Sequence, residues 1–351
     1  MSKKVLIAPL NWGLGHATRC IPIINALQQE GFEPVIASDG AALSLLKKEF
    51  PLLETKELPS YNIEYAKKAS NFKLKMLVNS PKIANAINAE KKMTKKILES
   101  DHYYGIISDN RMGVRHKSVP SVFITHQLTV LSGNTTNIST RLHNKYIKKF
   151  DVCWVPDMAD DPNLSGELGH PKRNQLPVTY LGPLSRFEHQ VLPKKYDIMV
   201  LLSGPEPQRS ILEKKLFQEF EKSDKSIVFV RGVIEDRHQT YVKNNITVHN
   251  YLTGKALENA INSSNLIISR SGYTTVMDLA KLKKKAFFIP TPGQFEQEYL
   301  AERLANNKLV PSCNQSDFTL KQLYQMNEYK GLSSFSTDID YGKLFHFFQR
   351  K

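Results

Sequence analysis

The stretch VLIAPLNWGLGHATRC, residues 5–20, places a histidine directly after a glycine-bearing turn. The apolar run Val5 to Ala8 leads into Gly13-Leu14-Gly15, and His16 follows. Gly13 and Gly15 let the backbone turn tightly and approach a ligand. A neutral imidazole at this point can accept a proton from a hydroxyl nucleophile, so His16 is a candidate general base. The alternative is a structural or helix-capping histidine.

A carboxylate follows a second strand-like run. Asp109 comes directly after Ile106-Ile107, at the end of the pattern that predicts this strand. A carboxylate there is either a rival base or the group that orients His16.

The stretch NLIISRSGYTTVMDLA, residues 265–280, has the same strand-loop-helix order. Free N–H groups at the start of its helix favour a phosphate, and nearby hydroxyls add donors. Asp278, further along the helix, can accept hydrogen bonds from two neighbouring sugar hydroxyls. The alternative is a capped helix with an exposed aspartate. The candidate residues before Asp278 are Arg270, Ser271, Gly272, Thr274 and Thr275.

A third loop, PTPGQFEQEYLA at residues 290–301, also follows a strand-like run. It presents Gln294, Glu296 and Gln297 at a predicted helix start. Amides and carboxylates suit a ligand with many hydroxyl groups. The alternative is an ordinary helix entry.

The elements that position these loops repeat along the chain. Strand-like runs alternate with helical patterns before and after the turn-forming Leu181-Gly182-Pro183-Leu184. This order predicts an α/β protein of two Rossmann-like, doubly wound domains. We expect an N-terminal domain at 1–184, a C-terminal domain at 185–340, and a helix at 341–351 that packs back on the first. Two such domains facing a cleft would bind ligands beyond the carboxyl ends of their strands.

Composition narrows the partners. The chain of 351 residues is too long for one ordinary core. Lys and Arg number 48 against 34 Asp and Glu, a net charge of +14 that favours an anionic partner. No nucleic-acid-binding signature accompanies this charge, so a nucleotide or an anionic membrane surface fits better than nucleic acid. The alternative is an ordinary lysine-rich surface.

The same survey predicts a cytoplasmic protein. No apolar run is long enough to span a bilayer, and the first residues do not resemble a cleaved signal peptide. The three cysteines are far apart and lack metal-ligand spacing, so we expect reduced thiols and no metal site.

Together, the loops resemble those of the GT-B glycosyltransferases, and most closely glycosyltransferase family 28, the MurG-like group. That family has a glycine-rich loop ending in His in its first domain, as in Gly13 to His16 here. Its second domain has Arg-Ser-Gly, then Thr, then an acidic residue. The matching residues here are Arg270, Ser271, Gly272, Thr275 and Asp278.

The resemblance implies an inverting transfer of a hexosyl or N-acetylhexosaminyl group from a UDP-sugar to a hydroxyl acceptor, with no essential metal and no cofactor. Asp278 would hold the ribose, and Gln297 would contact the donor sugar. His126-Gln127 resembles a segment on the acceptor side. The residues expected to bind the donor are Gly13, Gly15, Ser203, Gly204, Arg270, Ser271, Gly272, Thr274, Thr275, Asp278, Glu296 and Gln297.

Three departures leave the donor sugar open and argue against peptidoglycan synthesis itself. The acidic ribose residue is Asp278, where the family usually has Glu, and Leu300 replaces the family's Asn. The Ser203 loop contains two prolines and lacks a second glycine.

Asp338-Ile339-Asp340 resembles the metal-binding D-x-D of the other major glycosyltransferase fold, but we interpret it as a surface turn.

Residues 67–96 combine nine lysines with Leu74, Met76, Leu77 and Val78. An apolar patch framed by lysines can bind an anionic membrane. Since acceptors in the family are often lipid-linked, the resemblance implies a peripheral enzyme on the inner face of the membrane. The alternative is a packed helix pair with a lysine-rich solvent face.

Three other functions remain open. A nucleotide-sugar hydrolase would use water as the acceptor, and the pattern G-x-G-H-x-x-R of some GT-B hydrolases fits Gly13, Gly15, His16 and Arg19. A sugar-nucleotide epimerase would isomerise the donor without releasing UDP. A non-enzymatic sensor of nucleotide or anionic lipid would bind without turnover.

Overall fold

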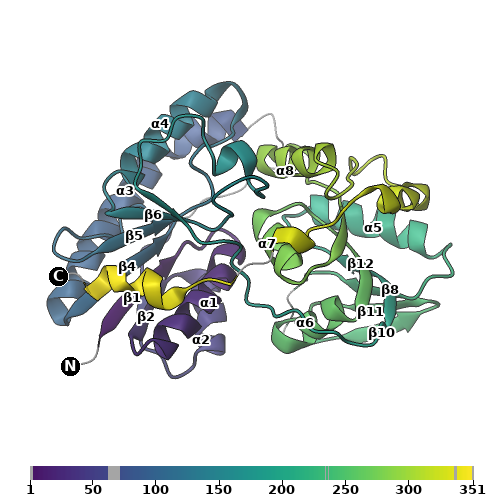
Figure 1. Cartoon of the computed structure of the whole chain (residues 1–351), viewed down its shortest axis with the longest axis horizontal. Helices are drawn as coiled ribbons and strands as arrows, with labels where there is room; N and C mark the ends of the chain where they lie inside the picture. Colours follow the sequence, from purple (N-terminus) through teal and green to yellow (C-terminus); the bar gives the residue numbers. More distant parts are fainter. Residues whose placement is uncertain (1–2, 62–71, 234, 236, 336–337, 350–351) are drawn as a thin grey trace. The chain divides into compact units, whose positions relative to one another are not determined.

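The computed structural model describes residues 3–61, 72–233, 235, 237–335 and 338–349 as two compact units (Figure 1). Unit 1 comprises the described residues up to Arg186 together with those from Asp338 onward. Unit 2 comprises the described residues 187–335. Within these ranges, no helix has both the length and the apolar content needed to cross a membrane.

Unit 1 is built on a parallel sheet. Its strands are β1 (Lys4–Pro9), β2 (Glu33–Ser38), β3 (Thr55–Glu57), β4 (Tyr103–Asp109), β5 (Ser121–Ile124), β6 (Val152–Val155) and β7 (Val178–Tyr180). Its helices are α1 (Gly15–Gln29), α2 (Gly40–Glu49), α3 (Phe72–Ser100), α4 (Thr136–Ile147) and α9 (Tyr341–Phe345). The described strands pair in the order β3-β2-β1-β4-β5-β6-β7.

The sheet of unit 1 changes direction between β1 and β4. The chain moves outward on one side from β1 to β2 and on the other from β4 to β5, and ligands bind at such a point in open parallel sheets. The register pairs Pro9 of β1 with Asp109 of β4. The loop that carries His16 and the strand that ends in Asp109 therefore start side by side.

The interior of unit 1 follows from its apolar strands. In β1, every residue after Lys4 is buried, as a parallel sheet covered on both faces requires. Ile97 of α3 packs with Leu6 and Ile106 in one hydrophobic cluster. α1 connects β1 to β2, and α2 connects β2 to β3, on the β1 side of the switch point.

Pro22 corrects an expectation about α1. The sequence predicts this proline near the start of the helix, where its missing N–H costs least. The helix instead begins at Gly15 and continues through Pro22 to Gln29. The prediction was wrong because the helix starts directly at the glycine turn, which places His16 in its first turn.

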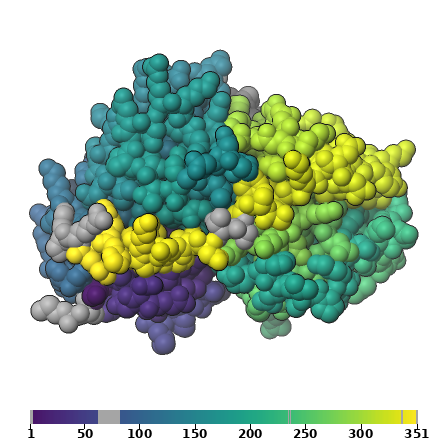
Figure 2. Space-filling model, viewed as in Figure 1, coloured from purple at the N-terminus to yellow at the C-terminus, as the bar shows by residue number. Residues whose placement is uncertain are grey.

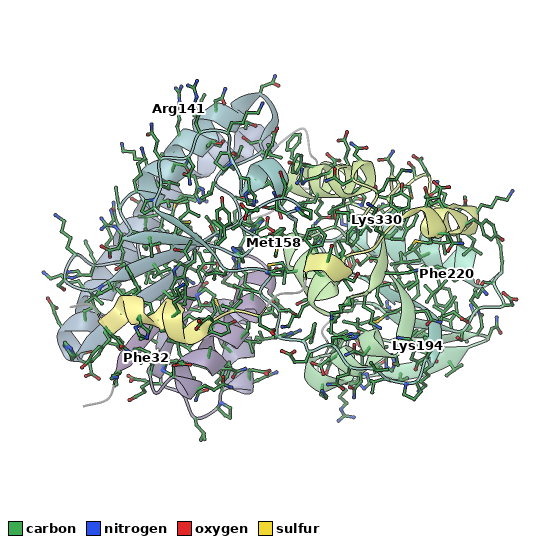
Figure 3. All side chains as sticks on the ribbon, in the orientation of Figure 1. Phe32, Arg141, Met158, Lys194, Phe220 and Lys330 are labelled. Atoms are coloured by element: carbon green, nitrogen blue, oxygen red, sulfur yellow. The ribbon has the colours of Figure 1, made fainter. Side chains whose placement is uncertain are left out.

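The C-terminal segment packs against the beginning of unit 1 (Figures 2 and 3). α9 and the short 3-10 helix η6 (His346–Gln349) bury Phe345 and Phe348. Both rings make aromatic contacts with Phe32 and Trp154. Asp340 accepts a hydrogen bond of 2.9 Å from the N–H of Lys343, so the second aspartate of the D-x-D stretch caps α9.

Unit 2 is a second open sheet. Its strands are β8 (Tyr196–Leu201), β9 (Ile227–Val230), β10 (Thr240–Lys243), β11 (Ile246–His249), β12 (Ser264–Ser269) and β13 (Lys285–Phe288). Its helices are α5 (Gln208–Phe220), α6 (Gly254–Asn262), α7 (Tyr273–Lys281) and α8 (Phe295–Asn306). The described strands pair in the order β10-β11-β9-β8-β12-β13.

The change of direction in unit 2 falls between β8 and β12. These strands are parallel, with Leu201 paired to Ser269 at their carboxyl ends. Leu212, Leu216 and Phe220 of α5 fill the core on one side of the sheet. The predicted fold class of two doubly wound α/β domains is confirmed.

The sequence patterns missed β10. This edge strand is antiparallel to β11, and all four of its residues are exposed. Because no side of it is buried, it lacks the apolar alternation by which strands are recognised. The turn to β11 uses Asn244 with a φ of 54°.

We expect Phe348→Ala to destabilise the protein by about 3–5 kcal/mol, because it removes a fully buried ring. Gly105→Ala should also destabilise, since its new Cβ would lie 2.2 Å from Cδ1 of Phe348. In the double variant the methyl group would enter the space left by the ring. Its thermal unfolding temperature should therefore fall by less than the sum of the single losses, whereas strict additivity would contradict this packing.

Candidate active site

Asp109 lies within hydrogen-bonding distance of His16 at the carboxyl edge of the unit 1 sheet. Nδ1 of His16 is 2.8 Å from Oδ1 of Asp109. The Asp109 side chain is fully buried, and 17% of the His16 side chain remains exposed. The structure thus brings together the two residues that the sequence nominated as bases, with the carboxylate behind the imidazole.

Arg19 completes this group. Its Nε donates to Oδ2 of Asp109 at 2.5 Å, and its Nη2 donates to Oδ1. The guanidinium is 2% exposed. Burial disfavours the charge on Asp109, but Arg19 and then His16 outweigh it, and the pKa of Asp109 lies well below its usual range. Asp109 is therefore ionised at neutral pH and can act only as an acceptor.

Nδ1 of His16 lies between two groups of opposite kind. It is 2.8 Å from Oδ1 of Asp109, which only accepts, and 2.9 Å from Nη2 of Arg19, which only donates. In the tautomer with the proton on Nδ1, the ring donates to Asp109 and Nε2 is the basic nitrogen. Burial lowers the pKa of His16 below its ordinary value, although Asp109 opposes this. The imidazole is therefore neutral at pH 7, in the form that a general base requires.

In the sequence, Arg19 stands out only as the last residue of the G-x-G-H-x-x-R pattern. It lies one helical turn after His16 on α1, on the buried side of the helix. A charged residue on a buried helix face needs an opposite charge nearby, and this was the available signal. Cys20 lies beside the same carboxylate, with its Sγ 3.7 Å from Oδ2 of Asp109. Burial raises the pKa of Cys20 well above its usual value, so it stays a thiol.

His126 is connected to this group through Arg19. Its Nδ1 is 3.3 Å from Nη1 of Arg19, and the residue is 6% exposed. Gln127 follows it, half-buried, with its backbone N–H donating to Oγ1 of Thr125 at 3.1 Å. Gly13 has a φ of 76° and open space around its α-carbon, so only the backbone conformation demands glycine there. Gly15 is the first residue of α1.

Two of the predicted phosphate loops follow neighbouring strands of unit 2. Ser203 and Gly204 come after β8 and are exposed, and Gly204 has a φ of 104°. Ser271 and Gly272 come after β12, and a Cβ on Gly272 would meet no atom within 4 Å. Because β8 and β12 are paired, both loops start from the same edge of the sheet.

Arg270 lies beneath these loops. It is 1% exposed, and its Nη1 donates to the carbonyls of Ile289 and Pro290 at 3.1 and 3.0 Å. Its Nη2 donates to the carbonyl of Gln208 and to Oε1 of Gln315. Burial lowers the pKa of Arg270 to about 10. The guanidinium therefore joins the starts of three loops of unit 2.

Gln297 also forms bonds within the protein. Its Oε1 accepts from the N–H of Thr291 at 2.9 Å, and its Nε2 donates to Gln294 at 3.0 Å. Its carbonyl accepts from Oγ of Ser271 at 2.7 Å, which ties the second loop to the third. Oγ1 of Thr291 is buried, and it has no hydrogen-bond partner among the described residues. It would lie 3.7 Å from a Cβ on Gly204.

The helix starts of unit 2 differ in charge. The first turn of α7 contains no acidic residue, so its N–H groups and positive dipole end suit a phosphate. At the start of α5, the carboxylate of Glu206 already accepts from the N–H of Ser210 at 3.2 Å. The first turn of α8 contains Glu296 and Glu298, which suit hydroxyl donors and oppose an anion. Thr274, Thr275 and Asp278 are half-buried on α7.

Within the described ranges, no cluster of three or more His, Cys, Asp or Glu side chains is placed to hold a metal ion.

Residues 207–328 match the model of the glycosyltransferase family 28 C-terminal domain. A protein of Haemophilus ducreyi named UDP-N-acetylglucosamine--N-acetylmuramyl-(pentapeptide) pyrophosphoryl-undecaprenol N-acetylglucosamine transferase is 25% identical over 340 residues, which cover 92% of this chain and 88% of that protein. The glycosyltransferase MK0977 of Methanopyrus kandleri is 23% identical over 327 residues, covering 86% and 90%.

Solved structures share the fold. MurG of Acinetobacter baumannii aligns over 100% of both chains with a TM-score of 0.60 at 14% identity. The glycosyltransferase SnogD of Streptomyces nogalater aligns over 100% of this chain and 96% of its own, with a TM-score of 0.65 at 13% identity. The predicted GT-B fold and the resemblance to family 28 are confirmed.

We expect Asp109→Asn to destabilise the protein by about 3–5 kcal/mol, because it leaves the Arg19 guanidinium buried without a carboxylate. Asp101→Asn is the matched control. Asp101 pairs with Lys4 at the surface of the same unit, where water screens the ion pair and its loss costs much less than that of a buried pair. Chemical denaturation of both variants measures the difference, and equal losses would show that Arg19 does not depend on Asp109.

Proposed function

We propose that this glycosyltransferase, whose residues 207–328 match the family 28 C-terminal domain, transfers a sugar from a UDP-sugar to a hydroxyl acceptor with inversion. The sugar is a hexosyl or N-acetylhexosaminyl group. The observation that carries the proposal is the neutral His16 held by an ionised, buried Asp109 at the switch point of unit 1.

In the proposed reaction, the acceptor oxygen attacks the anomeric carbon of the donor. Nε2 of His16 takes the hydroxyl proton while Asp109 stabilises the imidazolium that forms. The bond between the anomeric carbon and the diphosphate oxygen breaks, and UDP leaves with its electron pair. A single displacement from the opposite face inverts the anomeric configuration.

The donor is proposed to bind at the carboxyl edge of unit 2. Charge that develops on the leaving diphosphate would be stabilised by the backbone N–H groups of Ser203-Gly204, Ser271-Gly272 and the first turn of α7. Thr274 and Thr275 add hydroxyl donors, and Asp278 accepts from the ribose. Arg270 and Gln297 would act by holding the loops in place, since their side chains bond to the protein itself.

This arrangement supports a transfer without an essential metal. The start of α7, which lacks acidic residues, would supply the positive potential that a cation supplies elsewhere. Turnover that survives removal of divalent cations with EDTA would support this part of the proposal, and loss of turnover that Mg²⁺ or Mn²⁺ restores would refute it.

The acceptor is proposed to be lipid-linked, because the name of the Haemophilus ducreyi relative specifies a pyrophosphoryl-undecaprenol acceptor for that protein. Lys82, Lys92, Lys95 and Lys96 are exposed on α3. The side chains in the first part of α3 lie outside the described residues. They are those of Leu74, Met76, Leu77, Val78, Lys73 and Lys75. Lys67 and Lys68 also lie outside the described residues.

A neighbouring helix contributes apolar residues to the same side of unit 1. Ile138 and Leu142, one turn apart on α4, are 70% and 55% exposed. Arg141 points outward from α4 (Figure 3), and α4 contains no acidic residue. α4 and α3 meet through Tyr146 and Ile83 in one hydrophobic cluster. Exposed apolar side chains among basic ones fit an anionic lipid surface.

The first experiment incubates the protein with a panel of nucleotide sugars, with and without membrane lipid extract, and measures released nucleotide. Release that requires the extract supports the transferase and identifies the donor. Release without extract indicates the hydrolase. Isomerised donor without free UDP indicates the epimerase, and tight donor binding without either product indicates the sensor.

We expect His16→Gln to lower kcat by about 10²–10⁴-fold and to leave the donor KM unchanged, because it removes the proton acceptor alone. His102→Gln, at an exposed histidine of the same unit, is the control. Full activity in His16→Gln would rule out this mechanism.

In the wild type, kcat/KM should be level above about pH 6.5 and fall on acidification below it, since the pKa of His16 is lowered and protonation abolishes the base.

We expect the protein to sediment with vesicles that contain anionic lipid at low ionic strength, and to be released by salt. The double variant Ile138→Ser/Leu142→Ser should bind markedly less. Leu52→Ser is the matched control, because Leu52 is 98% exposed in the same unit but away from α4 in sequence. Absence of binding to anionic vesicles would refute the proposal that the protein binds a membrane.

A further inference from the structure

Asn11 occupies an unusual place in the loop that leads to His16. It is half-buried, and its Oδ1 accepts a hydrogen bond of 3.2 Å from the N–H of Ala42, in the first turn of α2. Its Nδ2 donates to Oδ2 of Asp39 at 3.1 Å. A side chain from a different loop therefore caps α2.

Asp39 stands at the position that normally supplies this cap. Aspartate is a preferred N-cap residue because its carboxylate accepts from the first free N–H groups of a helix. Here the side chain of Asp39 makes no capping bond. Its carboxylate bonds to Asn11 and to Nη2 of Arg111. Asp39 is thus a favourable N-cap residue by type, but its carboxylate is bonded to Asn11 and Arg111 and not to the first N–H groups of α2.

Gly40 leaves the space for this arrangement. Its φ is 51°, and a Cβ there would lie 2.4 Å from Nδ2 of Asn11 and 3.3 Å from its Cγ. Any side chain would have to displace Asn11 from α2. Glycine at this position is needed both for the backbone conformation and for the approach of Asn11.

Arg111 secures Asp39 and the end of β1 together. It is fully buried, and its Nε donates to the carbonyl of Pro9 at 2.9 Å. Its Nη1 donates to Oε1 of Glu90 at 3.0 Å. Glu90 also accepts from the N–H of Gly113, so both carboxylates around Arg111 have further partners. The guanidinium is therefore held in one position.

One short segment, from the last residue of β4 to Arg111, thus holds both ends of the His16 loop. Asp109 binds His16 and Arg19, and its carbonyl accepts from the N–H of Leu10 at 2.9 Å. Asn110, with a φ of 57°, turns the chain, and Arg111 then faces the opposite way toward Pro9 and Asp39. Only Trp12, Gly13 and Leu14 separate Asn11 from the start of α1.

We propose that Asn11, held by Asp39, Gly40 and Arg111, is a positioning residue that sets the place of His16 in the transfer reaction. The proposal rests on the proposed role of His16 as the base. Asn11 would act through the loop and not on the substrate. A small shift at its end of the loop would move the first turn of α1, and a misplacement of about 1 Å can cost about 10²-fold in rate.

The test exchanges the two side chains. Asn11→Asp places two carboxylates together, and Asp39→Asn removes the acceptor charge beside Arg111. The double variant restores a complementary pair: the new amide donates to the new carboxylate, which still accepts from Ala42. Ser44→Ala is the control, since it removes a side-chain bond within α2 to the carbonyl of Gly40 without touching Asn11.

We expect Asn11→Asp to lower kcat about 10- to 100-fold with the donor KM unchanged, and the double variant to return kcat to within a few-fold of the wild type. The nitrogen chemical shifts of the His16 ring should change in Asn11→Asp and recover in the double variant. If Asn11→Asp does not fold, Asn11→Ala deletes the same bonds without adding charge and should change kcat and these shifts in the same direction.

Unchanged kcat and unchanged His16 shifts, with only a lower unfolding temperature, would overturn the proposal and leave Asn11 as a helix cap. Failure of the double variant to recover would overturn it as well. The shifts of His16 do not depend on turnover. Full activity in His16→Gln would refute the proposed role of His16 as the base. The nitrogen shifts would still show whether Asn11 positions that ring.

Discussion

The constraint on which unit 1 depends is the buried negative charge of Asp109. A carboxylate without water is tolerated only where opposite charge and hydrogen-bond donors surround it. Arg19 supplies the charge, and His16 supplies a further donor. Both donors come from α1, one helical turn apart, so satisfying Asp109 also fixes the rotation of that helix. The same carboxylate accepts from Nδ1 of His16 in the tautomer whose basic nitrogen is Nε2.

The parallel sheet explains why this group forms at all. Strands β1 and β4 are adjacent although 93 residues separate His16 from Asp109. Their register brings Pro9 beside Asp109, and the loops that follow must occupy the same edge. In unit 2, β8 and β12 are likewise adjacent and parallel, so the Ser203-Gly204 and Ser271-Gly272 loops start from one edge of that sheet. In each unit, the polar residues that directly follow apolar strands are the ones gathered at one edge.

Two side chains expected at the donor, Arg270 and Gln297, form hydrogen bonds within the protein. Arg270 matches a family motif, yet its guanidinium bonds to loop carbonyls and to Gln315. Gln297 was expected at the donor sugar, and its amide closes the turn at Thr291. Motif spacing cannot distinguish the two uses, because a residue that shapes a loop stands at the same position as one that touches a ligand. Burial and the identity of the partner atoms make the distinction.

The sequence alone determined the fold class, the alternation of strands and helices apart from β10, and the loops that carry the candidate residues. These follow from local signals: apolar runs, glycine turns, and polar residues directly behind strands. Tertiary structure decided the partners. Arg19 bonds to Asp109 because two strands distant in sequence lie side by side, and Asn11 caps α2 because Arg111 and Asn11 bind the carboxylate of Asp39. Such choices depend on distances between separate elements, and no local pattern records them.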